Sequence, residues 1–218
     1  MNLVADSFAW PFRGPWRSSW LVGVPVVLFS PLLFIPLLGY AIAATRAAEG
    51  GAAHGPPAWH LSVRLITDGL WTAFAVLLVA LPFIVVFEPF AGALYGSHIW
   101  STGDPGQSLF YARVLAFLIL ALPLGIALLL VMPNATARFA STGRPRDLFD
   151  FAASLRAVRH DFATWNLAAA AIVTGWAVGV ACVGLLCVGI VPGIFYAILV
   201  SAHATAALHD KGSPPPAG

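Results

Sequence analysis

Several residues near the boundary between two apolar runs carry side chains that could form a polar site. Asp68 is the most prominent, because it directly precedes an uncharged run, and acids at membrane depth often bind protons or cations. Arg64 lies four residues earlier, a spacing that permits an ion pair on a helix. Tyr40 and Arg46 lie at the end of the preceding apolar run, and Trp59 lies in the linker. Together these five residues could line a polar cleft.

Each of these residues also has a structural interpretation, which we favour. A carboxylate in the first turn of a helix accepts hydrogen bonds from unpaired backbone N–H groups and meets the positive end of the dipole. We therefore predict that Asp68 caps the helix that follows it. Tyr40 and Trp59 would then belong to an aromatic belt at the membrane surface, with Arg46 facing lipid phosphate.

His203 is the histidine that lies well inside an apolar run, flanked by small residues in SAHATAA. Its imidazole could bind haem or a chlorophyll-type magnesium. The alternative is a histidine that is hydrogen-bonded within the bundle. We favour this alternative because haem usually takes a second axial ligand, and no other histidine lies at matching depth. The remaining histidines do not show metal-ligand spacing, so we predict no metal and no cofactor.

Composition places the chain in a membrane. It is 60% hydrophobic and only 9% charged, with a mean hydropathy of +0.87, whereas soluble domains carry about 25% charged residues. Its basic residues are few, which argues against a nucleic-acid partner. The segments between apolar runs are too short for a catalytic domain and contain no familiar catalytic motif, so we predict that the protein is not an enzyme.

Uncharged runs predict an all-α helical bundle of about four to five membrane segments within one domain, residues 18–210. A spanning helix needs about 20 residues, and the run at 162–209 is long enough for two helices joined by a turn at 187–193. The predicted segments are residues 18–45, 69–87, 109–137, 162–186 and 191–209.

The first of these segments is broken by prolines. Pro25, Pro31 and Pro36 each remove a backbone donor and bend a helix. The segment is therefore either a kinked span or a re-entrant hairpin that turns near Ser30-Pro31, and we favour the hairpin. Backbone that turns at membrane depth must be covered by protein.

Two flanking segments are predicted to lie at the membrane surface. Residues 1–17 mix aromatic rings with arginines, as an interfacial anchor does. Residues 145–160 are predicted to form an amphipathic helix in the interface, with an apolar face that includes Phe151 and Leu155. The tail at 211–218 is predicted to be disordered. The arginines that we expect to meet lipid headgroups are Arg13, Arg17, Arg144, Arg146, Arg156 and Arg159.

Arginine placement also predicts orientation. The loops at 46–64 and 138–159 hold seven arginines, whereas the loops at 88–108 and 186–191 hold none. Because basic loops remain on the cytoplasmic side, the first two loops should be cytoplasmic in a multi-pass protein of the cell membrane.

Small residues predict a packing seam near the end of the chain. Ala171, Gly175 and Gly179 share one helix face at four-residue spacing, and Gly189 and Gly193 repeat the pattern. Small residues let helices approach closely. A groove filled by lipid or a cofactor is the alternative.

One further set of residues along the chain matches the pattern of a known family. These residues are Pro11, Trp16, Gly39-Tyr40, Arg46, Gly50, Pro57, Trp59 and Asp68-Gly69-Leu70, followed by Arg138, Gly143, Phe149, Phe151 and Tyr196. On these residues the chain resembles the DUF4013 family of prokaryotic membrane proteins, whose function is unknown. The resemblance covers most of residues 8–210 and departs from the family where Pro56 replaces a usual leucine. It implies a protein of the prokaryotic inner membrane and assigns no catalytic residue.

Three functions are compatible with these features. The first, which we favour, is a non-enzymatic structural or accessory protein that interacts with lipids, a membrane partner or a second copy of itself. The second is a small transporter or permease subunit that uses Asp68 beside a broken helix. The third is a haem- or pigment-binding subunit that uses His203.

Overall fold

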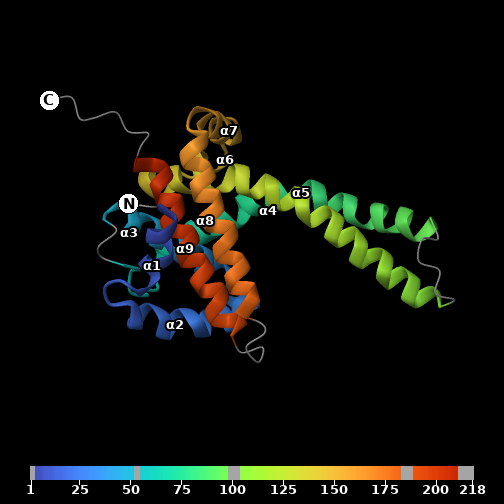
Figure 1. Ribbon diagram of the computed structural model, residues 1–218, viewed down its shortest axis with the longest axis horizontal. Coiled ribbons are helices and arrows are strands. Elements are labelled where there is room, and N and C mark those ends of the chain that lie inside the picture. Colours follow the sequence, from blue (N-terminus) through green and yellow to red (C-terminus); the bar gives the residue numbers. More distant parts are fainter. Residues whose placement is uncertain (1–2, 52–54, 98–103, 183–188, 211–218) are drawn as a thin grey trace. The chain divides into compact units, whose positions relative to one another are not determined.

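The fold was analysed in a computed structural model that describes residues 3–51, 55–97, 104–182 and 189–210. Within these ranges the ordered elements are helices, and no strand occurs. The predicted loop at 88–108 and turn at 187–193 fall partly outside the described residues, and the tail at 211–218 falls wholly outside them. The elements in Figure 1 are α1 (Leu3–Ala9), the 3-10 helix η1 (Trp10–Phe12), α2 (Trp16–Leu28), α3 (Ser30–Glu49), α4 (Val63–Gly96), α5 (Pro105–Thr142), α6 (Arg146–Phe149), α7 (Phe151–His160), α8 (Phe162–Ala181) and α9 (Ile190–Asp210).

Five of the described helices are long and apolar enough to cross a membrane, namely α3, α4, α5, α8 and α9. Large apolar side chains such as Leu77, Ile84, Phe117 and Leu122 are exposed along α4 and α5. A soluble protein would not expose so many contiguous apolar groups, whereas lipid tails can cover them. The prediction of an all-α membrane bundle is confirmed.

The chain forms two compact units. Unit 1 comprises residues Met1–Ala73 and Val131–Gly218, and unit 2 comprises Phe74–Leu130. In unit 2 the later part of α4 and the earlier part of α5 line an apolar hollow of about 430 Å³. Arg113 pairs with Glu88 across this unit at 3.3 Å. Both helices extend beyond the uncharged runs at 69–87 and 114–137, since α4 begins at Val63 and ends at Gly96 and α5 begins at Pro105 and ends at Thr142.

Two helices make up the proline-broken first segment. The break lies at Phe29, one residue before Ser30-Pro31, and Leu33 also has non-helical backbone angles (φ −107°, ψ 20°). Pro31 lies in the first turn of α3, where a missing N–H costs nothing. Pro25 and Pro36 lie inside α2 and α3, where each removes a helical hydrogen bond. Of the two helices, α3 is the one with the length and hydropathy of a span.

The N-terminal segment packs against the last two helices, α8 and α9. Trp10 is completely buried and belongs to the same apolar cluster as Phe195 and Leu199. The Tyr196 hydroxyl donates a hydrogen bond to the Phe8 carbonyl at 3.0 Å. Trp10 is therefore packed within the protein, and the interfacial position of residues 1–17 stays a prediction. Phe12 remains exposed, as an interfacial ring would be.

The amphipathic segment at 145–160 contains two helices instead of one. The backbone leaves helical geometry at Asp150, whose carboxylate accepts a hydrogen bond from Ala153 N at 2.9 Å and caps α7. An aspartate at this position competes with the helical backbone and favours a new helix start. Leu148 and Val158 are buried, whereas Leu155 is exposed.

Candidate functional site

Asp68 lies at the centre of an ion-pair cluster that joins α3, α4 and α5 within unit 1. Its Oδ2 atom lies 3.2 Å from Arg46 Nη2 and 3.9 Å from Arg64 Nε. Arg46 Nε also donates a hydrogen bond to the Ala140 carbonyl at 2.9 Å. Asp68 is buried, and its charge is compensated by two guanidinium groups, so the cluster fastens helices together.

The prediction that Asp68 caps a helix is wrong. Helix α4 begins at Val63, and the Ser62 hydroxyl accepts a hydrogen bond from Leu65 N at 3.1 Å, as a capping residue does. Asp68 lies in the second turn, where its own backbone carbonyl accepts from the Thr72 hydroxyl at 2.8 Å. Its role is therefore defined by the partner helices rather than by the end of its own helix.

Tyr40 and Trp59 form an aromatic stack that holds the linker. Their rings are 4.0 Å apart and nearly parallel, with an angle of 5° between planes. The Tyr40 hydroxyl donates to the Pro57 carbonyl at 2.9 Å, and the Ser19 hydroxyl donates to the same carbonyl at 2.8 Å. The five residues predicted to line one cleft thus make two sets of contacts, the aromatic stack and the ion-pair cluster.

Gly39 and Gly69 bring α3 and α4 into backbone contact beside the ion-pair cluster. A Cβ atom at Gly39 would lie 1.9 Å from the Leu65 carbonyl oxygen, and one at Gly69 would lie 2.0 Å from the Ile35 carbonyl oxygen. Backbone cannot move aside as a flexible side chain can. The contact therefore requires glycine at both positions.

The seam between α8 and α9 contains most of the small residues expected there. A Cβ atom at Gly179 would lie 2.6 Å from the Gly193 carbonyl oxygen, and Gly175 packs against Val200. Ala171 is fully buried in a cluster with other alanines. Gly189 lies in the turn before α9, where its carbonyl accepts from Gly193 N at 3.0 Å.

His203 is packed and hydrogen-bonded. Its Nδ1 atom lies 2.9 Å from the Ser7 hydroxyl, and its ring lies 5.5 Å from that of Trp10. Among the described residues, no group of three potential metal ligands comes together. These contacts favour the interpretation of His203 as a bundle histidine that anchors α1.

Arg138 fixes the α6–α7 segment to the end of α5. Its Nη2 atom donates to the carbonyls of Asp147 and Asp150 at 3.0 and 2.9 Å and to the Ser154 hydroxyl at 3.0 Å. One guanidinium group therefore spans both short helices. Arg138 thus holds this segment in place, and the other arginines of the segment are exposed.

The arginines predicted to meet headgroups fall into two groups. Arg13 forms an ion pair with Asp6 at 2.6 Å, and Arg17 lies over the Trp16 ring. The second group is exposed, and within the described parts of the chain its members form no salt bridge. We call this group the basic face; it consists of Arg144, Arg146, Arg156 and Arg159.

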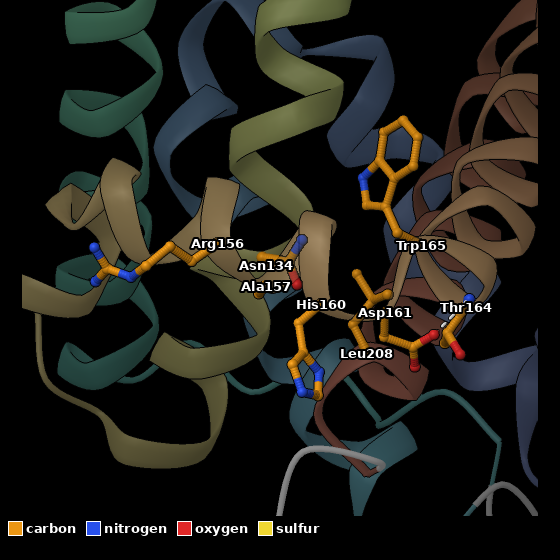
Figure 2. Close-up of a pocket in the computed structure, with 8 residues that line it drawn as sticks. All are labelled: Asn134, Arg156, Ala157, His160, Asp161, Thr164, Trp165 and Leu208. Carbon is orange, nitrogen blue, oxygen red and sulfur yellow. Dashed lines mark hydrogen bonds between the residues drawn. The ribbon is translucent and has the colours of Figure 1, made fainter.

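A polar pocket of about 460 Å³ lies next to the basic face, within unit 1 (Figure 2). Asn134 is buried in its wall, and Figure 2 shows the Arg156 side chain pointing away from Asn134 and Asp161. The Asp161 carboxylate caps α8 by accepting from Thr164 N at 3.1 Å. The lining residues are Asn134, Arg156, Ala157, His160, Asp161, Thr164, Trp165 and Leu208.

Sequence reasoning assigned Arg156 to lipid contact but did not find this pocket. Asn134 is one residue that could have indicated a polar site from the sequence, because an amide inside the uncharged run at 114–137 must find partners. Asp161 ends the charged segment immediately before an apolar run, as a helix cap does. Neither signal reveals that the two residues share a pocket with Leu208 of α9.

Five apolar helices, ion-paired helix junctions and arginine-rich ends define a multi-pass integral membrane protein. The family model of the protein of unknown function DUF4013 matches residues 23–189, and the chain belongs to that family. Searches of curated proteins and of solved structures gave no match.

Proposed function

We propose that this protein is a non-enzymatic accessory component of the prokaryotic inner membrane whose basic face binds anionic lipid headgroups. The observation that carries the proposal is the set of four exposed arginines on and beside α6 and α7, held in position by Arg138. Guanidinium groups pair readily with phosphate oxygens. The acids of this segment do not neutralise the face, since Asp147 contacts Thr142 and Asp150 contacts Arg138.

The neighbouring apolar residues support an interfacial position for this segment. Leu155 is exposed on α7, and Phe151 is half-buried at its start. An amphipathic helix with arginines on one side and apolar groups on the other lies along the lipid surface. Each basic residue near an anionic membrane contributes about 1 kcal/mol, so four of them would produce a marked preference for anionic lipid.

The contacts support the other two functions less well. A transporter would use the Asp68 carboxylate for a proton or cation, but two arginines already pair with it. A pigment subunit would use His203, but Ser7 and Trp10 occupy its surroundings. Lipid binding by the basic face requires no rearrangement of the contacts around Asp68 or around His203.

Replacing all four arginines of the basic face by glutamine should abolish most of the preference for anionic lipid. The measurement is the association of spin-labelled phosphatidylglycerol relative to phosphatidylcholine with the protein in bilayers. We expect the preference for phosphatidylglycerol to fall severalfold in the fourfold variant. In the wild type, the preference should weaken as the salt concentration rises. The control replaces Glu88 and Arg113 by glutamine, which removes an exposed ion pair elsewhere. An unchanged preference in the fourfold variant would rule out the basic face as the lipid site.

The same proposal places the loops at 46–64 and 138–159 on the cytoplasmic side. The hydrogen bond from Arg46 to the Ala140 carbonyl supports a common side for both. Single cysteines at Ala58 and Ser141, in a background without Cys182 and Cys187, should be protected from membrane-impermeant reagents in intact cells. Permeabilisation should expose both. Labelling of either position in intact cells would contradict the orientation.

A further inference from the structure

The helices of unit 2 are less buried than the other apolar helices. In their most apolar stretches only 11% of the residues of α4 and α5 are buried, compared with 56% in α9. Apolar side chains of both helices, Phe83 and Phe117 among them, line the hollow of about 430 Å³ in this unit. Lipid tails can cover apolar side chains as well as protein can. What fills the hollow is therefore decided by the shape of α5 and by the charges beside the hollow.

Helix α5 carries a ridge of large side chains beside a row of small ones. Leu118, Leu122 and Ile126 follow one another at four-residue spacing, and all three are exposed; we call them the α5 ridge. Ala121 and Gly125 lie in the next row and line the hollow, since residues three apart are neighbours on a helix surface. The ridge of one α5 helix can therefore pack into the row of small residues on another.

The row of small residues favours a helix over a lipid chain in the hollow. In unit 1, Gly179 and Gly193 bring α8 and α9 into close contact. Gly125 also lies inside an apolar helix, yet a Cβ atom there would meet nothing within 4 Å. Small residues allow two helix backbones to approach closely, whereas an acyl chain can lie against larger side chains equally well.

An exposed ion pair lies at one end of the hollow. Glu88 directly follows Phe87, and Arg113 lies one turn before Phe117; both phenylalanines line the hollow. Arg113 Nη2 lies 3.3 Å from Glu88 Oε2, but the two side chains remain 49% and 64% exposed. Their contact uses one of five guanidinium donors and one of about four acceptor sites on the carboxylate. Each group can therefore bind a further group of opposite charge.

These charges are complementary to those of a second copy of the chain. Two copies inserted in the same orientation form a closed dimer about a twofold axis along the membrane normal, and such an axis keeps each residue at its own depth. Because Glu88 and Arg113 are in contact, Arg113 of one protomer lies level with the partner's Glu88. A lipid phosphate at this position would be attracted by Arg113 but repelled by Glu88.

We propose that the chain forms a twofold symmetric dimer through unit 2. The α5 ridge of each protomer packs into the hollow of the other, and the Glu88 and Arg113 side chains of both protomers form one network of alternating charges. This surface contains none of the four arginines of the basic face, so the inference goes beyond lipid binding.

The test is energy transfer between donor- and acceptor-labelled copies of the full chain in lipid vesicles, measured as the protein is diluted in lipid. We expect transfer in the wild type that persists on dilution. Gly125→Leu should weaken association about tenfold or more, because the added side chain occupies the space that the partner's ridge needs. A wild type that is monomeric at every dilution, with lipid in the hollow, would overturn the proposal. Wild-type association of Gly125→Leu would overturn it as well.

The matched control is Gly92→Leu. Gly92 also lies inside a helix of unit 2 with nothing within 4 Å of a Cβ, but it does not line the hollow. This variant should associate as the wild type does. Neither substitution should lower the melting temperature of the monomer in dilute detergent, because leucine is a better helix former than glycine. Equal loss of association in both variants would contradict a role for the hollow.

Charge reversal distinguishes contacts between protomers from the contact within one. Glu88→Arg and Arg113→Glu each place like charges opposite one another in a dimer, so each variant alone should associate about tenfold more weakly. A mixture of the two variants should recover energy transfer, because a positive surface then meets a negative one. No recovery on mixing would overturn the proposal, since an ion pair that acts only within one protomer predicts that result. All these variants keep the basic face, so its phosphatidylglycerol preference should persist and the two proposals can fail separately.

Discussion

Gly69→Ala should be one of the most damaging single substitutions in this protein, lowering the free energy of unfolding by about 3 kcal/mol or more. The added Cβ would lie 2.0 Å from the Ile35 carbonyl oxygen and 2.9 Å from Gly39 N. Both neighbours are backbone atoms of α3, so the clash is relieved only if the two helices separate. Separation would also stretch the ion pair between Arg46 and Asp68.

A matched control is available on the same helix. Gly92 also lies inside α4, but a Cβ there would meet nothing within 4 Å. Gly92→Ala should therefore be neutral or stabilise the helix by up to about 1 kcal/mol, because alanine is the better helix former. Thermal unfolding of both variants in detergent provides the comparison. Equal stability of the two variants would show that the close approach of α3 and α4 does not hold the fold together.

Asp68→Asn should destabilise the protein by about 2 kcal/mol. Removing one member of a buried ion pair costs about 3–5 kcal/mol, because the other charge is left uncompensated. Here the Arg46 side chain is 28% exposed, so water offsets part of that cost. A simple capping role would predict no loss, since asparagine caps as well as aspartate does. The measurement is again thermal unfolding in detergent.

Two further variants test whether the effect arises from the pairing with Arg46. Arg64→Gln should change stability little, because Arg64 is 65% exposed and its closest approach to Asp68 is 3.9 Å. Arg46→Gln combined with Asp68→Asn should cost less than the sum of the single changes, since neither partner is then left charged. If Asp68→Asn is as stable as wild type but abolishes the cellular phenotype, the transporter function takes precedence.

The membrane helices could be predicted from the sequence because a bilayer excludes charged side chains, so each spanning segment is visible as an uncharged run of neighbouring residues. Runs without Asp, Glu, Lys or Arg located all five apolar helices, and prolines located the break that the structure places at Phe29. The ends of the helices were less predictable. Asp68 was assigned to a first turn because the uncharged run begins there, yet the helix starts at Val63 behind the Ser62 cap.

The candidate sites depend on contacts between distant parts of the chain. Arg46 reaches the Ala140 carbonyl, and Asn134 and Leu208 line one pocket, although neither pair is close in sequence. Residue types indicate that Arg46 and Asn134 need partners, but tertiary packing decides which partners they receive. Sequence prediction also failed within the segment at 145–160. Aspartate is a common helix cap, but the regular apolar spacing suggested one continuous helix, whereas Asp150 caps a second helix, α7.

The docking of α1 has a consequence for biogenesis. The Ser7 hydroxyl contacts His203 and the Phe8 carbonyl contacts Tyr196, so α1 is synthesised well before its partners, which lie 196 and 188 residues later. At about 5–20 residues per second, translation of the intervening chain takes about 10–40 s. During this time the N-terminal aromatic segment must be held by lipid or by the insertion machinery. The packing of α1 against α9 is thus a late step that follows membrane insertion. A chain truncated before α9 would leave α1 without these partners.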